Sequence, residues 1–336
     1  MKQLKAFKLT RRMKIILLLA LLAALIVIPF VIKDKYILHI IISCFIYACL
    51  ALSLNLIIGL SGQFSLGHVT FYGMGAYTTA LLMMRADMSF WLAALISAVF
   101  VGLVGALLAI PTLKLRGDYI AVVTLGFGEV FRLFVLNAVD LTRGPMGLPG
   151  IPSPSIFGYE ISSKVQYYFF GLIILIIVVI FILRLTNSGF GLAMLSVKED
   201  DIAANAIGIY PVKYKLLAFT IGAVIAGVVG SFYAVYTAFI SPSSFQYGES
   251  ISMVAMVVLG GLGSIPGSII GAGVLTILPE ALRSFSDYRL IIYGLAMVIM
   301  MIFRPNGIWG IEKRPRNAYL AYIERGVRFG KNTPGA

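Results

Sequence analysis

The feature that most constrains this chain is a succession of long apolar runs between residues 15 and 303. Most runs are about 17–25 residues long, the length of a helix that crosses the hydrocarbon layer of a bilayer. Charged residues make up 12% of the 336 residues, against about 25% in soluble domains. The sequence therefore predicts an all-α, polytopic membrane protein.

Glycine and proline divide the apolar sequence into ten candidate spans. The runs lie at 15–32, 37–60, 66–84, 90–110, 119–138, 165–184, 215–240, 248–262, 266–282 and 287–303. We expect about ten transmembrane helices in one domain over 15–303, flanked by basic tails at 1–14 and 304–336. The runs at 248–262 and 266–282 are short, with small residues between them. We expect these two to be broken or re-entrant, a backbone that is tolerated where it is buried in protein or lines a cavity.

The basic residues indicate how the spans are oriented. Residues 1–14 carry six basic side chains and no acidic one, and residues 304–336 carry seven against two. Basic flanks mark the cytoplasmic side, so we expect both tails to be cytoplasmic and to contact lipid headgroups rather than nucleic acid. The run at 15–32 follows a basic start as in a signal peptide, but its length and the absence of a clear cleavage site predict an uncleaved span.

An even number of spans then fixes the side on which each connection lies. We expect the connections at 61–65, 114–118 and 188–213 to share the cytoplasmic side. The connection at 140–164 is rich in proline, glycine and serine and is expected on the outer side.

The polar stretch "SVKEDDIAANAIGIYPVKYK" interrupts the apolar sequence at residues 196–215. Ser196 and Glu199 fit a capping box, and Gly208 suits the position just after a helix end. We therefore expect one short cytoplasmic helix over 197–207. A helix of this length is unstable alone in water, so it either docks in a protein groove or is an ordinary capped connector.

Two stretches share an apolar run, a break of glycine and serine, and then further small residues: "LIIGLSGQFSLGHVTFYGMGAYTTALL" and "VVLGGLGSIPGSIIGAGVLTILP". Interrupted segments of this kind in two halves of a transporter indicate a substrate pathway. The alternative is close helix packing, which small residues also favour. The candidate pathway residues are Gly62, Gln63, Ser65, Gly67, His68, Gly73, Gly75, Gly261, Gly263 and Gly267.

Two pairs of opposite charge lie within predicted spans. Glu129 and Arg132 are three residues apart, as are Glu280 and Arg283, and residues at this spacing share a helix face. Charges at membrane depth usually face the interior of a helix bundle. The pairs either line a pathway or neutralise each other and fix helix orientation, and we favour the second interpretation.

Several kinds of active centre have no sequence support. There is no glycine-rich loop ending in Lys-Ser or Lys-Thr that would bind ATP. Cys44 and Cys49 lie in an apolar run without metal-ligand spacing, and His39 and His68 are isolated. No pairing of nucleophile and base is evident, so we expect no catalytic residue and no metal. Energy for transport must then come from a partner subunit or an ion gradient, and the few carboxylates disfavour a proton relay.

The segment "DIAANAIG" resembles the cytoplasmic loop of ABC importer permeases, in which an Ala-Ala-x-x-x-Gly core forms the coupling helix that enters a groove on the ATPase. Ala203, Ala204 and Gly208 match that core, and Ile202 stands where the family often has glutamate. The resemblance assigns ATPase coupling to Glu199, Asp200, Asp201, Ala203, Ala204 and Gly208.

Further segments resemble the LivM type of branched-chain amino acid ABC permease. They are "LSLNLIIGLSGQFSLGHVTFYGMGAYTTALL", "LRGDYIAVVTLGFGEVFR", "LTRGPMGLPGIP", "VVLGGLGSIPGSIIGAGVLTILPE" and "FRPNGIWG", which lie within residues 37–310. The resemblance implies ten spans, a LivH-like second permease, two LivG/LivF-like ATPases and an external solute-binding protein in a prokaryotic inner membrane. ATP and magnesium would then bind to the partners, and this chain would hold no cofactor.

Leucine, isoleucine and valine are the substrates that the resemblance implies, and we expect 140–164 and 241–250 to receive the binding protein. Related permeases carry urea, amides or other amino acids. A secondary, ion-driven transporter and a membrane scaffold or enzyme without transport remain alternatives.

Overall fold

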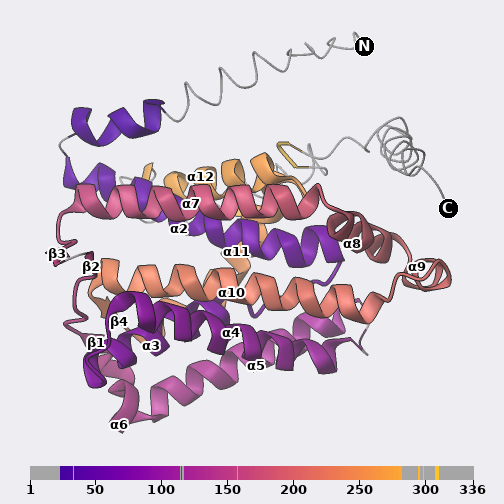
Figure 1. Cartoon of the computed structure of the whole chain (residues 1–336), viewed down its shortest axis with the longest axis horizontal. Coiled ribbons are helices and arrows are strands. Elements are labelled where there is room, and N and C mark those ends of the chain that lie inside the picture. Colours follow the sequence, from indigo (N-terminus) through magenta and orange to yellow (C-terminus); the bar gives the residue numbers. More distant parts are fainter. Residues whose placement is uncertain are drawn as a thin grey trace, which may run out of the picture.

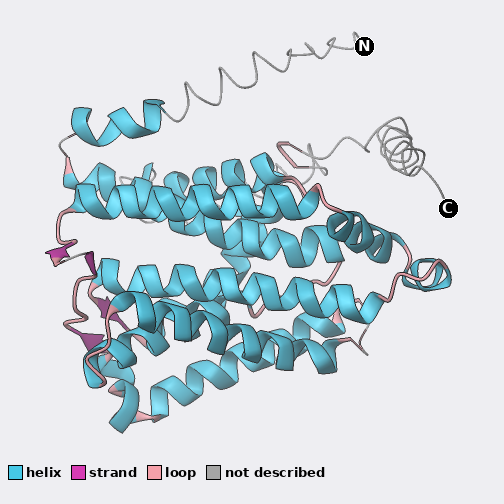
Figure 2. Cartoon of the chain, in the orientation of Figure 1, coloured by secondary structure: helices cyan, strands magenta, loops and turns pink. Residues whose placement is uncertain are grey.

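The computed structural model describes residues 23–32, 34–113, 115, 117–156, 158–281, 294–295, 298 and 307–309. Most of these residues are helical, with two short strand pairs at one end of the molecule (Figure 2). Residues 23–31 are helical, and the later helices are α2 (Lys35–Asn55), η1 (Leu56–Leu60), α3 (His68–Arg85), α4 (Phe90–Thr112), α5 (Tyr119–Asn137), α6 (Val139–Thr142), η2 (Gly144–Met146), α7 (Lys164–Thr186), α8 (Gly189–Glu199), α9 (Asp201–Ala206), α10 (Pro211–Thr237), η3 (Pro242–Phe245), α11 (Tyr247–Gly260) and α12 (Ile265–Ala281). The strands are β1 (Leu148–Pro149), β2 (Ser155–Ile156), β3 (Tyr159–Glu160) and β4 (Phe239–Ile240).

Five helices in the described part of the chain are long and apolar enough to cross a membrane. They span 35–60, 90–112, 119–137, 164–186 and 211–237, and they match five of the ten predicted runs. The 18-residue α3 and the 17-residue α12 cover two further runs. The runs at 15–32 and 287–303 lie partly or mostly outside the described residues, so the count of ten stays a prediction.

The runs at 248–262 and 266–282 form two separate helices joined by a non-helical turn, and their re-entrant course stays a prediction. α11 has 14 residues, about 21 Å of helix, which is shorter than the hydrocarbon layer of about 30 Å. Between α11 and α12 the backbone leaves the helical region, because Gly261 and Gly263 have φ angles of 113° and 82°. Glycine reaches such angles without steric cost.

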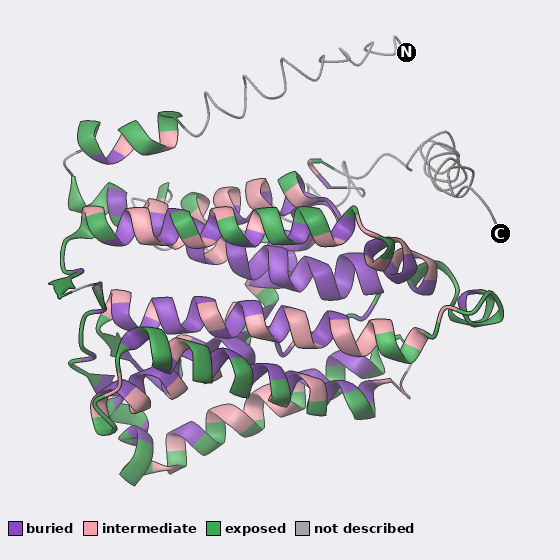
Figure 3. Cartoon of the chain, viewed as in Figure 1, coloured by how far each residue is buried: buried purple, intermediate pink, exposed green. Residues whose placement is uncertain are grey.

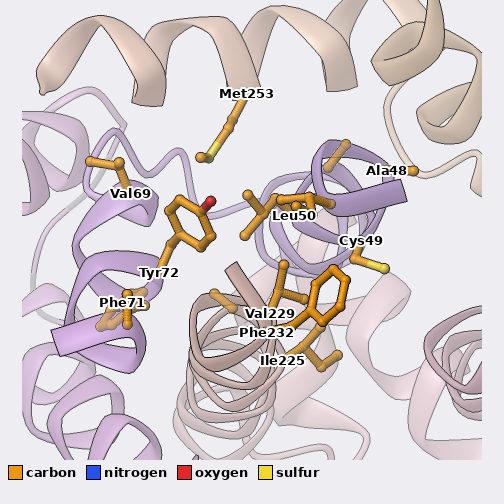
Figure 4. Packing of buried hydrophobic residues seen from close by; sticks show 14 of the residues in the cluster. Ala48, Cys49, Leu50, Val69, Phe71, Tyr72, Ile225, Val229, Phe232 and Met253 are labelled. Carbon is orange, nitrogen blue, oxygen red and sulfur yellow. The ribbon is translucent and has the colours of Figure 1, made fainter. Parts of the chain in front are cut away.

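The core lies where α2, α3, α10 and α11 meet. Figure 4 shows Leu50, Tyr72, Phe232 and Met253 gathered there, one from each helix. Figure 3 shows buried residues concentrated on α2 and α10, whereas α5 is largely uncovered. Lipid is as apolar as a leucine side chain, so close packing of small residues has to bring membrane helices together.

Gly75 is an instance of such packing. A Cβ atom added to Gly75 would lie 2.2 Å from the carbonyl oxygen of Gly227, so only glycine lets α3 and α10 approach this closely. Gly73 lies against the rings of Phe131 and Phe245. Close helix packing therefore explains these two glycines of the sequence pattern.

The two ends of the bundle differ in construction (Figure 1). The α9 end consists of α8, α9 and parts of two connections, Ser61–Gln63 and Leu115 with Gly117, which line a common cleft. The strand end consists of α6, η2 and the four strands, with β1 paired to β4 and β2 to β3. The charges predicted that 61–65, 114–118 and 188–213 lie together and that 140–164 lies opposite, and this grouping by end is confirmed for the described residues (Figure 1).

The prediction of one helix over 197–207 capped by Ser196 is wrong. Ser196 lies inside α8, and its hydroxyl donates to the carbonyl oxygen of Leu192 at 3.0 Å. The break falls at Asp200, whose side chain caps the six-residue α9. Buried Met194 and Val197 extend the apolar face of α8 past Ser196. Packing therefore continues the first helix through the serine, and the aspartate becomes the cap.

Candidate functional site

An open cleft of about 370 Å³ lies at the α9 end. Its lining residues come from the connections before α3 and before α5, and from α5, α8, α9 and α10 near that end, namely Ser61, Gly62, Gln63, Leu115, Gly117, Ile120, Val197, Lys198, Glu199, Asp200, Asp201, Ile202 and Lys215. The structure thus brings together two groups that the sequence analysis assigned to different roles. Gly62 and Gln63 belong to the candidate pathway, and Glu199, Asp200 and Asp201 belong to the candidate coupling segment.

Backbone hydrogen bonds and one ion pair position α9 at the mouth of this cleft. The carboxylate of Asp200 accepts from the amides of Ile202 at 2.8 Å and Ala203 at 3.0 Å. These bonds, that of Ala203 first, lower the pKa of Asp200, because they stabilise its charged form. Lys215 of α10 donates to the carboxylate of Asp201. Gly208 follows the helix with a φ of 85°, in the predicted position.

The exposed surface of α9 differs from the alanine face that the resemblance suggests. Ala204 is 2% exposed and faces the chain itself, whereas Ala203 is exposed. The large exposed side chains are Ile202 and Ile207, which are 75% and 72% exposed. In the sequence, Ile202 stands out only as a departure from the family pattern. Two isoleucines in a polar stretch were the available signal for an apolar contact surface.

Buried polar atoms without a partner are concentrated at the start of α3. Among the described residues, six buried side-chain atoms lack a hydrogen-bond partner: Gln63 Nε2, Ser65 Oγ, His68 Nδ1, Thr70 Oγ1, Tyr77 OH and Thr276 Oγ1. Five of the six lie within residues 63–77. An unsatisfied buried polar group costs about 1–3 kcal/mol, so this concentration needs a reason other than stability.

Other atoms of the same side chains are held firmly. The Nε2 atom of His68 lies 2.7 Å from the Ser53 hydroxyl of α2, and the amide oxygen of Gln63 accepts from Ser61 at 3.0 Å. Gly67 presses on α5, because an added Cβ would lie 2.2 Å from the carbonyl oxygen of Thr124. The unpartnered atoms of Gln63 and His68 thus belong to side chains that are fixed elsewhere.

A small cavity of about 10 Å³ lies beside this segment, between α3, α5 and α11. That volume is about the size required for one water molecule. Leu66, Val69, Glu129 and Ser250 are among its lining residues, and the Ser250 hydroxyl accepts from the amide of Val69 at 3.2 Å.

Glu129 and Arg132 form an ion pair within α5. The Nε atom of Arg132 lies 2.8 Å from a carboxylate oxygen of Glu129, and the two side chains are 30% and 36% exposed. The pair therefore neutralises itself on a partly uncovered helix while Glu129 also reaches the small cavity. Of the second predicted pair, Arg283 lies outside the described residues.

The second glycine group surrounds the break between α11 and α12. Gly263 and Gly261 form the turn, and Gly267 packs on α11, where an added Cβ would lie 2.3 Å from the carbonyl oxygen of Gly260. Within the described residues, no group of three or more histidine, cysteine, aspartate or glutamate side chains could hold a metal ion.

Comparison with known proteins identifies the family. Residues 36–302 match the model of the branched-chain amino acid transport system permease component. The chain is 40% identical over 290 residues to the high-affinity branched-chain amino acid transport system permease protein LivM of Salmonella typhimurium, covering 78% of this chain and 67% of that protein. The Escherichia coli LivM is also 40% identical, over 286 residues.

The permease protein LivH of Salmonella typhimurium is 30% identical over 292 residues, which cover 79% of this chain and 91% of LivH. No solved structure matches the chain. The family match and the apolar helices together establish a multi-pass membrane protein. The chain belongs to the permease component family of branched-chain amino acid transport systems.

Proposed function

We propose that this chain is a membrane-spanning subunit of an ATP-driven importer that carries leucine, isoleucine and valine across the inner membrane of a prokaryote. The names of its LivM and LivH relatives supply the substrate class and the expected pairing with a LivH-like permease. One structural observation supports the proposal above the others. Gly62 and Gln63, at the start of the candidate pathway, share a cleft with the coupling segment at Asp200 and Asp201.

The α9 end is the proposed docking site for LivG/LivF-like ATPase subunits. Ile202 and Ile207 offer an apolar contact at the tip of the molecule. The Asp201–Lys215 pair ties α9 to α10 and Asp200 connects α9 directly to α8 along the chain, so a push on α9 moves those helices as well. ATP and magnesium bind to the partner subunits in this proposal, and this chain holds no cofactor and has no ATPase site of its own.

The proposed substrate path passes the start of α3. The unpartnered atoms of Gln63, Ser65, His68, Thr70 and Tyr77 are buried in this conformation, and a second conformation would offer them to the zwitterionic group of an amino acid or to water. Because the cavity beside them admits only about one water molecule, this conformation is closed there. Transport then requires α3 and α5 to separate.

The strand end is the proposed outer face that receives the solute-binding protein. β1 belongs to the 140–164 connection and β4 precedes the 241–250 segment, and their pairing places these two segments side by side. This orientation puts the α9 end and both basic tails in the cytoplasm and requires the predicted even number of spans.

Co-purification tests the proposed docking. The tagged chain is extracted from native membranes in mild detergent, and the partners are identified by mass. We expect a second permease and an ATPase pair in fixed stoichiometry. Ile202→Asp should lose the ATPase pair and keep the second permease, because a charge replaces an apolar contact.

Ile202→Leu is the matched control and should retain all partners. Recovery of the ATPase pair with Ile202→Asp at the unaltered yield would contradict docking at α9. Recovery of the unaltered chain without partners would contradict ATP-driven transport and favour ion-driven transport.

A further inference from the structure

The last turn of α2 is a junction between segments that are distant in sequence. α2 continues into the π-helical turn η1, all of whose residues are buried. A π turn is rare and often marks a functional position. The last four carbonyl groups of a helix have no partner within that helix, so the carbonyls of η1 must find theirs elsewhere.

The first connection runs from η1 to the coupling segment. The ammonium group of Lys198, near the end of α8, donates to the carbonyl oxygen of Gly59 at 2.8 Å. The stem of Lys198 also lies against Gly62, where an added Cβ would be 3.1 Å from the lysine Cγ. A lysine at a helix C-terminus satisfies a free carbonyl and is attracted by the negative end of the helix dipole.

The second connection runs from α2 to the break between α11 and α12. The side-chain oxygen of Asn55 accepts from the amide of Gly263 at 2.7 Å, and its nitrogen donates to the carbonyl of Ser264 at 3.3 Å. Asn55 is only 3% exposed. A Cβ on Gly59 would lie 2.0 Å from the Asn55 oxygen and 2.4 Å from the Gly263 nitrogen. The same α2 turn therefore contacts both Lys198 and the break.

A third segment closes the far side of the break. The amides of Ile308 and Trp309 donate to the carbonyls of Leu259 and Gly260 at 2.8 and 3.0 Å, which satisfies the end of α11. Gly307 has a φ of 79°, and its Cβ would lie 2.4 Å from the backbone of Gly261. The break is thus held by backbone contacts on one side and by Asn55 on the other.

We propose that Lys198 is a positioning residue that transmits movement of the coupling segment, through Gly59 and Asn55, to the glycine break between α11 and α12. This proposal rests on the proposed docking of an ATPase at α9. When α8 moves, the Lys198–Gly59 hydrogen bond pulls the π turn η1 with it. The moving turn then displaces the Asn55 side chain, which is bonded to the amide of Gly263. A single hydrogen bond from a flexible lysine can break and re-form in each transport cycle. The glycine break gives the backbone the freedom that α11 and α12 need in order to move.

Lys198→Met in the full complex tests this role, because methionine preserves the length and packing of the stem and removes the ammonium group. The complex is reconstituted in proteoliposomes, and amino acid uptake and ATP hydrolysis are measured together. We expect normal assembly, near-normal basal hydrolysis, and an uptake per ATP hydrolysed that falls about tenfold, since a charge-assisted bond is lost. Lys198→Arg can still reach the Gly59 carbonyl, so its uptake per ATP hydrolysed should stay within about threefold of that of the unaltered chain.

Lys213→Met is the matched control, because Lys213 is an exposed lysine near the same end. It should leave the ratio of amino acid uptake to ATP hydrolysis unaltered. An unchanged ratio in Lys198→Met, or equal losses of uptake and hydrolysis with a lower melting temperature, would show a merely structural tie and overturn the proposal. An unaltered complex that contains no ATPase would overturn this proposal together with the proposed function, and that result is seen before any variant is made.

A double-variant cycle gives a second test that does not depend on the size of one effect. If Lys198 and Asn55 act in one chain of contacts, Lys198→Met combined with Asn55→Ala should lower the ratio little further than the worse single variant. Effects that multiply would show that the two residues act independently, and the proposed transmission would then be wrong.

Discussion

The two ends of the bundle are held together by different kinds of bond. At the strand end, backbone pairs with backbone: β1 with β4 and β2 with β3. At the α9 end, the segments are tied by the side chains of Lys198 and Lys215 around an open cleft. Backbone pairing keeps a surface in one shape, whereas long side chains allow their segments to move. The comparison indicates a rigid receiving surface at one end and a movable driven segment at the other.

The strand end has side-chain bonds in addition to its paired backbone. Arg85 donates to the carbonyls of Asp140 and Leu141, and the indole nitrogen of Trp91 donates to the carbonyl of Ser155 at 2.9 Å. α3 and α4 are therefore bonded directly to the long connection. If this end is rigid, damage to it should reduce stability, and damage at the α9 end should reduce coupling instead.

The largest effect should come from Gly147→Val at the strand end. Gly147 has a φ of 70°, and an added Cβ would lie 2.3 Å from the carbonyl oxygen of Ile240, so β1 and β4 must separate. Backbone strain alone costs about 1–3 kcal/mol, and the clash adds to it. We expect a clear fall in melting temperature in detergent. Gly150 shares the positive φ, but an added Cβ there has no neighbour within 4 Å, so Gly150→Val should lower the melting temperature less. Equal falls in melting temperature would show that the strand pairing does not contribute to stability.

The second effect should come from Asp200→Ala, which removes the cap of α9. The amides of Ile202 and Ala203 lose their acceptor, so hydrogen exchange across α9 should accelerate and uptake should fall several-fold at unaltered melting temperature. Asp200→Asn keeps a good cap and should resemble the unaltered chain. Equal exchange in both variants would contradict the assignment of Asp200 as the cap.

The same cap predicts how the stability of α9 depends on pH. The N–H bonds lower the pKa of Asp200, so their stabilisation is complete above the ordinary pKa of an aspartate. It is lost as the pH falls through the lowered value. The protection of the α9 amides, measured against the exchange rate of an unfolded peptide at the same pH, should therefore be steady near neutrality and fall only in acid. Asp200→Asn should lack this loss of protection in acid.

A moderate effect should come from Thr70→Val, between the two ends. The Thr70 hydroxyl is buried without a partner, so its removal should leave stability unchanged or raise it by about 1 kcal/mol while slowing uptake. Thr79→Val is the matched control, because the Thr79 hydroxyl bonds Ser231 at 2.7 Å, and it should lower stability instead. Unaltered uptake in Thr70→Val would separate this hydroxyl from the substrate path.

The smallest effect should come from Trp91→Phe. It removes one exposed hydrogen bond to Ser155, worth about 0.5–1.5 kcal/mol. We expect a small loss of stability and normal uptake per ATP hydrolysed. A loss of coupling without a loss of stability would break the distinction between the two ends.

The sequence predicts structure correctly where one physical quantity dominates. The length of the apolar runs located α4, α5, α7 and α10, because a bilayer demands about 20 apolar residues. Glycine clusters located the α11–α12 break, because few other residues reach the φ angles of Gly261 and Gly263. Basic flanks grouped the connections correctly by end.

The sequence does not predict the features that tertiary contacts decide. Ser196 and Asp200 are both good caps, and the buried face of α8 decided between them. Ala204 matches the family core, yet it faces inward. Nothing local marks a π turn at Leu56–Leu60, and the Lys198–Gly59 bond joins residues 139 positions apart. These features depend on how the helices pack, which a periodicity does not specify.

The most direct test of the central claim is leucine uptake by proteoliposomes that contain the chain with its co-purified partners and its solute-binding protein. Enclosed ATP should drive uptake that isoleucine and valine compete for, that a non-hydrolysable ATP analogue does not support, and that a protonophore leaves intact. Uptake that needs no ATP and collapses with the protonophore, or that only urea or an amide competes for, would contradict the account.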